Sequence, residues 1–349
     1  MAGHRPPSMR TGAYARARQR LPEKVVQRLF EQTGAALSAK AQAQHLWLGH
    51  VVKVLDGSTV LMSDTAANQA AYPQHPNQRP GCGFPIAQVV GMFCLATGAA
   101  IGVQIAAWKT SEIALARAWY STLQPNDVVL ADRAYGSYVD LVLVQQRRAD
   151  GVFRLRQARR TDFAQAQSLG KQDYLVSWSR PQSRPKTMTP AHFDTLPDTL
   201  LVRVVFFSVE RPGWRAQTIT LVTTLRDPNT YSKTQLAALY GLRWQVEVNL
   251  KHLKTTLTMD MLKARSPAMV RKEIWVHLMA YNLLRDLMWQ AATDPQQDPL
   301  RLSLKGTQQA FNHWRPLLAN AQPPIFPHYR DALLCQATIQ MSLGRQLVG

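Results

Sequence analysis

Along the first half of the chain, short apolar runs alternate with segments in which apolar residues recur at helical spacing. Turn-forming residues separate the two kinds of segment. The runs that predict buried strands cover residues 51–55, 58–62, 127–131 and 152–156. Apolar residues at helical spacing predict helices over residues 21–47, 111–123 and 137–149. This alternation is typical of an α/β fold in which a mixed sheet is flanked by helices.

The first two strands are expected to be separated by a turn. Gly57 follows Asp56 directly after the first apolar run, and a short strand resumes at Ser58. Because glycine adopts turn conformations without steric cost, we predict a tight turn at Gly57. That turn would leave Asp56 at the end of the first strand.

Residues 81–108 contain no charged side chain, and a stretch of that length could cross a membrane. Gln88 and Gln104 lie inside it, however, and residues 96–99 interrupt it with turn formers. We therefore predict two buried strands joined by a tight turn, over residues 86–107, and no membrane contact.

The sequence changes character between residues 157 and 232. Proline recurs there, at Pro181, Pro185, Pro190, Pro197 and Pro212. Two segments, residues 200–209 and 218–224, still have the pattern of strands, so the region is predicted to be a β-rich insertion. Later segments predict helices over about residues 233–258, 267–292, 300–320 and 330–345.

Basic residues outnumber acidic ones: 41 Lys and Arg face 22 Asp and Glu, which gives a formal net charge of +19. Such a chain repels itself when it is compact, and nucleic acid is the commonest polyanionic partner. A solvated basic surface would explain the charge equally well.

The three cysteines, Cys82, Cys94 and Cys335, lie far apart and have no metal-binding spacing. This argues against a disulfide framework and against a structural zinc site. A reducing cytoplasm fits this use of cysteine.

Three acidic residues lie at positions suited to chemistry. Asp56 and Asp132 each follow an apolar run, and Glu247 lies in the middle of a basic helical segment. If neighbouring strands carry the two Asp residues, their carboxylates could share Mg²⁺, which prefers oxygen ligands. A lone Asp after a strand is more often a turn or helix cap, so Glu247 decides between the two interpretations.

Tyr240, Arg243, Glu247 and Lys254 follow one another at steps of three, four and seven residues. On one continuous helix these steps place the four side chains within a stripe roughly 60° wide. An ion pair between Arg243 and Glu247 on a solvated helix face would explain the same spacing. The excess of basic residues between positions 239 and 272 favours DNA contact instead.

In these motifs the chain resembles the transposases of the group named for insertion sequence four. The signature of that group, Tyr-(2)-Arg-(3)-Glu-(6)-Lys, falls on Tyr240, Arg243, Glu247 and Lys254. Other matching stretches are residues 12–22, 56–59, 64–68, 81–85, 130–133 and 281–285. The resemblance extends from about residue 12 to residue 290.

The resemblance implies a ribonuclease-H-like core with a β-rich insertion between the second Asp and the Glu, and a helical C-terminus. It implies a DDE transposase that nicks transposon ends and transfers strands into target DNA. The catalytic and metal-binding triad falls on Asp56, Asp132 and Glu247, with two ions of Mg²⁺ or Mn²⁺. Tyr240, Arg243 and Lys254 are expected to contact DNA, together with Arg133 and Lys251. The implied partners are double-stranded DNA and a second copy of the chain, on DNA in the bacterial cytoplasm and nucleoid.

The patterns and the resemblance divide the chain into five expected segments. They are a basic, apparently shortened DNA-binding region at 1–47, a first part of the core at 48–156, the insertion at 157–232, the catalytic helix with the rest of the core at 233–292, and a C-terminal region for dimerisation or DNA contacts at 293–349. Relatives commonly carry a further N-terminal domain that grips the terminal repeats. The alternative function is therefore that of a truncated, transposition-deficient relative that binds DNA as an inhibitor or remnant.

Overall fold

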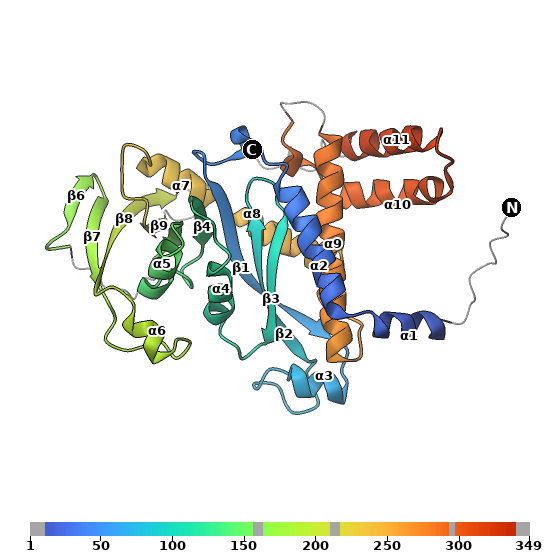
Figure 1. Cartoon of the computed structure of the whole chain (residues 1–349), viewed down its shortest axis with the longest axis horizontal. Coiled ribbons are helices and arrows are strands. Elements are labelled where there is room, and N and C mark those ends of the chain that lie inside the picture. The colour runs from blue at the N-terminus through green and yellow to red at the C-terminus, as the bar shows by residue number, and fades with distance from the viewer. Residues whose placement is uncertain (1–10, 156–162, 210–216, 293–296, 340–349) are drawn as a thin grey trace.

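The apolar runs of the first half form five adjacent strands of one sheet in the computed structural model, which describes residues 11–155, 163–209, 217–292 and 297–339. The strands are β1 (Val51–Met62), β2 (Ile86–Cys94), β3 (Ala100–Ala107), β4 (Asp127–Ala131) and β5 (Asp150–Arg154). They lie in the order β3-β2-β1-β4-β5 (Figure 1), with β1 to β3 antiparallel and with β4 and β5 parallel to β1. Helices α4 (Glu112–Tyr120) and α5 (Tyr138–Gln145) make the crossovers. This is the ribonuclease-H-like arrangement, and the predicted fold class is confirmed.

The prediction of a turn at Gly57 is wrong, because β1 is one continuous strand of 12 residues. The antiparallel partner β2 pairs with it without interruption, from Lys53 opposite Cys94 to Leu61 opposite Ile86. Asp56 therefore lies within the strand. Past the last pair with β4, the strand continues until a two-residue strand, β10 (Met261–Leu262), pairs with its far end.

The uncharged stretch forms the predicted pair of strands, β2 and β3, which lie side by side in the sheet. Most of its side chains are buried between the sheet and the helices on either face. Among the residues that the structure describes, no helix is both long and apolar enough to span a bilayer.

The insertion continues the same sheet. Its elements are β6 (Gln167–Gly170), β7 (Asp173–Ser179), α6 (Pro190–Asp194), β8 (Thr199–Val209) and β9 (Gln217–Thr223). The two predicted strands, β8 and β9, are confirmed, whereas β6 and β7 were not predicted. Because β9 pairs with β5, the sheet runs on through β8, β7 and β6.

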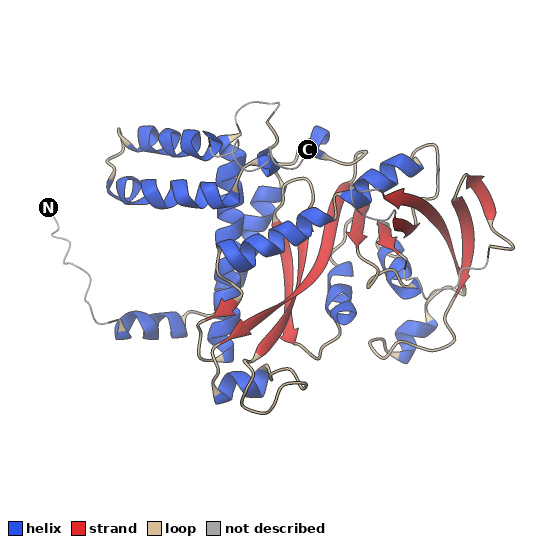
Figure 2. Ribbon diagram, turned by 180° about the vertical axis from the view of Figure 1, so that it is seen from behind, coloured by secondary structure: helices blue, strands red, loops and turns tan. Residues whose placement is uncertain are grey.

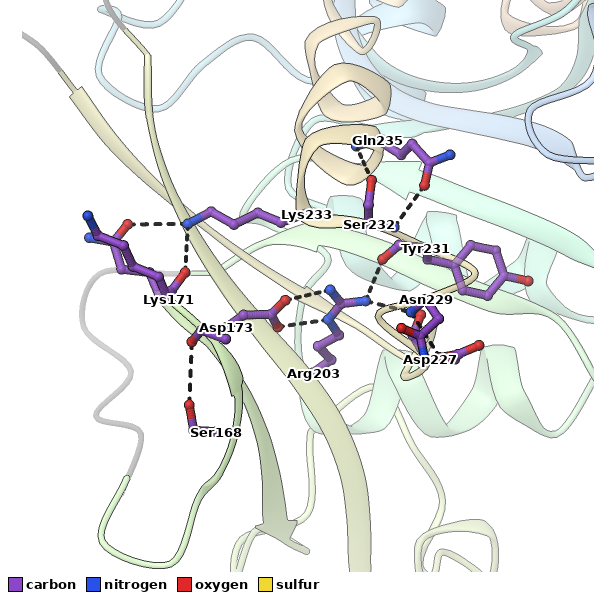
Figure 3. A network of polar contacts seen from close by, with 12 residues as sticks. Ser168, Lys171, Asp173, Arg203, Asp227, Asn229, Tyr231, Ser232, Lys233 and Gln235 are labelled. Atoms are coloured by element: carbon purple, nitrogen blue, oxygen red, sulfur yellow. Dashed lines mark hydrogen bonds and ion pairs between the residues drawn. The ribbon is translucent and has the colours of Figure 1, made fainter.

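A buried ion pair anchors the insertion (Figure 3). The Arg203 guanidinium, which is fully buried, donates to both carboxylate oxygens of Asp173 at 2.8 and 2.5 Å. It also donates to the backbone oxygen of Tyr231 at 2.6 Å. The Tyr231 hydroxyl in turn shares a hydrogen bond of 2.8 Å with His50, just before β1. Strands of the insertion are thereby tied to the segment that leads into α7 (Lys233–Gly241).

Helices cover both faces of the sheet and enclose two main apolar clusters. On one face, α2 (Glu23–Ser38) runs beside the long α9 (Pro267–Ala291), and the rings of Phe30 and Trp275 lie 5.4 Å apart. A β-carbon on Gly34 would lie 2.6 Å from the backbone oxygen of Ala100, so α2 rests directly on β3. The other face is covered by α4 and α5.

Several predicted helix boundaries are wrong. The helix expected over 21–47 ends at Ser38, and a capping box between Gln42 and His45 then starts a separate 3₁₀ turn, Ala43–His45. A short helix, α1 (Gly12–Arg20), precedes it. The last two helices are α10 (Leu304–Asn320) and α11 (Phe326–Ile339), and they project from α9 at the end of the molecule away from β6 (Figure 2). The rest of the helix expected over 330–345 lies outside the described residues.

We expect Asp173→Ala to destabilise the protein by about 3–5 kcal/mol, because it leaves the buried Arg203 charge without its partner. The measurement is the midpoint of urea unfolding. Asp198→Ala is the matched control, since Asp198 pairs with Arg180 but is 88% exposed, and such pairs contribute about 1 kcal/mol or less. Equal losses in the two variants would contradict the anchoring role of Asp173.

Candidate active site

Three parallel strands stop pairing with one another at the same level, which brings their next residues together. Leu55 of β1 pairs with Ala131 of β4, and Ala131 pairs with Phe153 of β5. One position further along lie Asp56 on β1, Asp132 after β4 and Arg154 at the end of β5. The two Asp residues predicted from the sequence therefore occupy neighbouring places at one edge of the parallel part of the sheet.

Burial dominates the electrostatics of Asp56. It raises the pKa of the Asp56 carboxyl from 3.8 to about 6, and the negative charges of Glu112 and Glu247 act in the same direction. A hydrogen bond of 2.9 Å from the backbone N–H of Gly57, together with the Arg243 cation, lowers the pKa but offsets only part of this rise. Burial thus disfavours the ionised form of Asp56 even with Arg243 beside it.

Tyr240 and Asp132 are in direct contact. The phenol lies near the end of α7, is 7% exposed, and donates to Oδ1 of Asp132 at 3.2 Å. Burial, and next the charge of Asp132, raise the pKa of Tyr240, so its proton stays in place to serve as a donor.

Arg243 lies between the other two acids. Its Nη2 atom donates to Oε1 of Glu247 at 2.6 Å, and its Nη1 atom lies 3.9 Å from Oδ2 of Asp56. The guanidinium also lies over the Tyr240 ring, 5.8 Å from its centroid. Glu247, on α8 (Trp244–Lys251), has a side chain that is 57% exposed. The ion pair that offered an alternative explanation of the spacing is thus present, and it lies beside Asp56.

The continuous helix predicted over 233–258 is wrong. Helix α7 ends at Gly241, and α8 begins at Trp244 after a tight turn in which Arg243 N–H bonds to the oxygen of Tyr240. A π-helical turn, His252–Thr256, then follows α8. Leu242 and Arg243 keep right-handed helical backbone angles through this turn, and the Arg243–Glu247 pair keeps the i,i+4 spacing of a helix.

The motif at residues 281–285 holds α8 in place. Arg285, which is buried, donates to Oδ1 of Asn249 on α8 at 2.7 Å and to the Tyr281 hydroxyl at 3.0 Å. That hydroxyl donates to the backbone oxygen of Gly98 in the β2–β3 turn at 2.8 Å. Asn282 bonds to both backbone polar groups of Ala100 at 2.9 Å. Helix α9 thus joins the helix of Glu247 to the sheet.

The other predicted DNA-contacting residues follow closely in sequence on Asp132 and Glu247. Lys254 is half-buried in the π-helical turn, and Lys251 is exposed at the end of α8. Arg133, exposed, follows Asp132. Within the described ranges, no ion pair links Lys251 or Lys254 to the three acids.

Two charged residues at this edge were missed in the sequence analysis. Arg154 lies level with Asp132, and its charge acts on Tyr240. Glu112, the first residue of α4, lies so close to Gly57 that a β-carbon there would be 2.3 Å from its Oε1 atom. Aligning the ends of the parallel strands could have identified Arg154. No sequence pattern indicates the contact of Glu112.

The donor chemistry at the site suits a divalent cation, since Asp56, Asp132 and Glu247 all offer hard carboxylate oxygens. The unfavourable burial of the Asp56 charge also favours a cation beside it. Across the part of the chain that the structure describes, however, no three His, Cys, Asp or Glu side chains converge closely enough to hold one ion. The Glu247 carboxylate instead forms an ion pair with Arg243.

Comparison with known proteins agrees with this geometry. A family model described as the transposase DDE domain matches residues 47–283, more than half of the chain. The chain belongs to the DDE transposase family. It is 28% identical over 291 residues to the transposase InsG of insertion sequence element IS4 from Escherichia coli strain K12, which agrees with the group expected from the signature. That alignment covers 82% of this chain and 62% of InsG, so the chain spans less than two thirds of this relative.

Two further similarities are more limited. The transposase for insertion sequence element IS421 from Escherichia coli is 37% identical over 70 residues, which is 20% of this chain and 19% of that relative. A piggyBac transposase, solved as a synaptic complex with hairpin DNA, superimposes with a TM-score of 0.43 at 11% identity. The superposition covers 81% of this chain and 57% of the piggyBac chain.

In the metal-free protein, we expect Asp56→Asn to increase stability above pH 6 by about 2–3 kcal/mol. The folded carboxyl titrates near 6 and the unfolded one near 3.8, so the folded state binds the proton more tightly. That contribution to stability is complete below pH 3.8 and is lost as the pH rises through 6. The gain of the variant should therefore vanish near pH 4.

The measurement is the unfolding midpoint in EDTA at pH 4 and at pH 8. Asp64→Asn, at an exposed position, is the control and should show no such gain. A difference between Asp56→Asn and wild type that is the same at both pH values would show that burial of the Asp56 charge is not costly.

Proposed function

We propose that this chain cuts and joins DNA as the transposase of an insertion sequence. Membership of the DDE transposase family supports this proposal. The single observation that carries it furthest is the convergence of five residues from three segments of the chain: Asp56, Asp132, Tyr240, Arg243 and Glu247. Their contacts unite both Asp motifs with three of the four signature residues.

In this proposal, Asp56, Asp132 and Glu247 bind divalent metal ions, as DDE transposases generally do. We propose Mg²⁺, which Mn²⁺ could replace, and two ions. Bound there, such ions would activate the attacking hydroxyl and neutralise the charge on the leaving 3′-oxygen. The costly burial of Asp56 and its place beside Asp132 support this assignment.

In the present arrangement Arg243 donates to Oε1 of Glu247 at 2.6 Å, and in this proposal Glu247 exchanges that partner for metal ions. We therefore propose that Arg243 serves as a counterion for Asp56 and Glu247 before DNA and metal bind. Once released, the guanidinium is available to pair with a phosphate, for which its planar fork is well suited.

The reaction at the DNA is a substitution at phosphorus. A water molecule attacks the scissile phosphate in nicking, the P–O3′ bond breaks, and a 3′-hydroxyl is released. In joining, that hydroxyl attacks a phosphate of the target strand, the P–O3′ bond at that phosphate breaks, and a 3′-hydroxyl of the target strand is released. Tyr240, Arg243 and Lys254, with Arg133 and Lys251, are proposed to hold phosphates on either side of the scissile bond.

We further propose that the chain works as a homodimer on double-stranded transposon ends and target DNA, in the bacterial cytoplasm and at the nucleoid. The net charge of +19 supports DNA as the partner. The projecting α10–α11 pair supports dimerisation, since Leu317, Ile325 and Phe326 are each more than 40% exposed there.

We expect metal-dependent nicking and strand transfer on a DNA duplex that carries the inverted repeats flanking the gene. Mg²⁺ should support cleavage, and EDTA should abolish it. Glu247→Gln should reduce the rate by about 10²–10³-fold, since it removes one carboxylate from the site where charge develops. The measurement is the appearance of nicked and joined strands on a denaturing gel.

Glu31→Gln, at an exposed position on α2, is the control for the loss of one carboxylate and should cleave like wild type. Absence of cleavage by the wild type, with salt-sensitive DNA binding retained, would overturn the proposal. It would leave the chain as a DNA-binding relative that does not transpose.

A further inference from the structure

Glu112 lies against the strand residue next to Asp56. It is the first residue of α4, and its carboxylate occupies the space that a side chain at position 57 would need. The closest approach is 2.3 Å between Oε1 and an ideal β-carbon on Gly57, so only glycine permits this contact. Glycine at position 57 is therefore explained by the contact with Glu112 and not by a turn.

The same carboxylate is bonded to the loop that begins with Asp132. Tyr135 is 1% exposed, and its hydroxyl donates to Oε1 of Glu112. Its backbone N–H donates to the oxygen of Asp132 at 3.1 Å, which closes a tight turn. Burial, and next the bond to Glu112, raise the pKa of Tyr135 far above its usual range, so the phenol remains a donor.

One carboxylate therefore touches two segments that reach the site separately. On one side it packs on β1 beside Asp56, and on the other it receives the phenol of the Asp132 loop. Past Leu55 and Ala131 the strands β1 and β4 no longer pair, so backbone hydrogen bonds do not hold these segments together at that level. Glu112 supplies a side-chain link at that point.

We propose that Glu112 is a positioning residue, which through Gly57 and Tyr135 sets the spacing between the Asp56 and Asp132 carboxylates. This inference rests on the proposed function. In that function both acids bind one cation, so the spacing between their carboxylates affects binding. Residues that orient metal ligands through hydrogen bonds typically contribute about 10–100-fold to metal affinity or activity.

The test is a titration of the metal-free, full-length protein with Mn²⁺ alone, followed by the electron paramagnetic resonance signal of the free ion. Tyr135→Phe and Glu112→Ala should each weaken Mn²⁺ binding by about 10–100-fold, because each breaks the link. Glu112→Gln should stay within about fivefold of wild type, since its amide oxygen still accepts the phenol and only a nearby charge is lost. Thermal unfolding of each variant checks that it is folded.

Tyr138→Phe is the matched control. Tyr138 is also 1% exposed, and its hydroxyl donates to the backbone oxygen of Pro197, in the insertion. Its loss should lower stability as for any buried hydrogen bond while Mn²⁺ affinity remains that of wild type.

Each other outcome overturns a different statement. Unchanged affinity in Tyr135→Phe would show that the link does not position the ligands. Equal weakening by Glu112→Gln and Glu112→Ala would make the carboxylate itself a ligand, which also overturns the positioning role. If wild type shows no Mn²⁺ binding that depends on Asp56, the proposed function fails, and this inference fails with it.

Discussion

The register between parallel strands is the constraint on which the rest of the site depends. The strands β1, β4 and β5 run in the same direction, and β4 and β5 end at the level of Asp56, which lies within the longer β1. The pairing of Leu55 with Ala131, and of Ala131 with Phe153, then places Asp56, Asp132 and Arg154 at one level. A shift of one residue between β1 and β4 would separate the two acids and turn one of them to the opposite face, and a shift between β4 and β5 would displace Arg154. This alignment is maintained by the crossover helices α4 and α5 and by the contacts that hold α8 against α9.

The site combines acids whose mutual repulsion must be offset. Asp56 feels the charges of both Glu112 and Glu247, and burial removes much of the water that would screen them. Arg243 offsets part of this repulsion from the tight turn between α7 and α8. These buried charges make this edge of the sheet less stable than apolar side chains there would. Such a loss of stability is common at sites that bind charged ligands.

Features that depend on residues close together in the sequence could be predicted, whereas features that depend on contacts between distant segments could not. The boundaries of β4 were predicted to the residue, because a short, fully buried parallel strand is a continuous apolar run. The prediction for Gly57 failed because the reason for glycine is Glu112, a neighbour in space on another element. The break before Trp244 was missed since the apolar period continues across it.

The same distinction applies to the candidate site. Asp56, Asp132, Tyr240, Arg243 and Glu247 were identified from motifs, and the structure brings them together. Arg154 and Glu112 required the strand register and the helix packing, which no single segment of sequence contains. The metal-binding, catalytic and DNA-binding roles of the predicted site residues remain predictions.

The pairing of β9 with β5 has a consequence for how this fold can vary. Removing the insertion would leave β5 as the edge strand of a five-stranded mixed sheet, with a row of unpaired backbone groups open to other chains. The insertion therefore pairs with an edge strand that could otherwise bind other chains, and it also adds to the core. A chain that lost β9 would need another segment to shield that edge from aggregation.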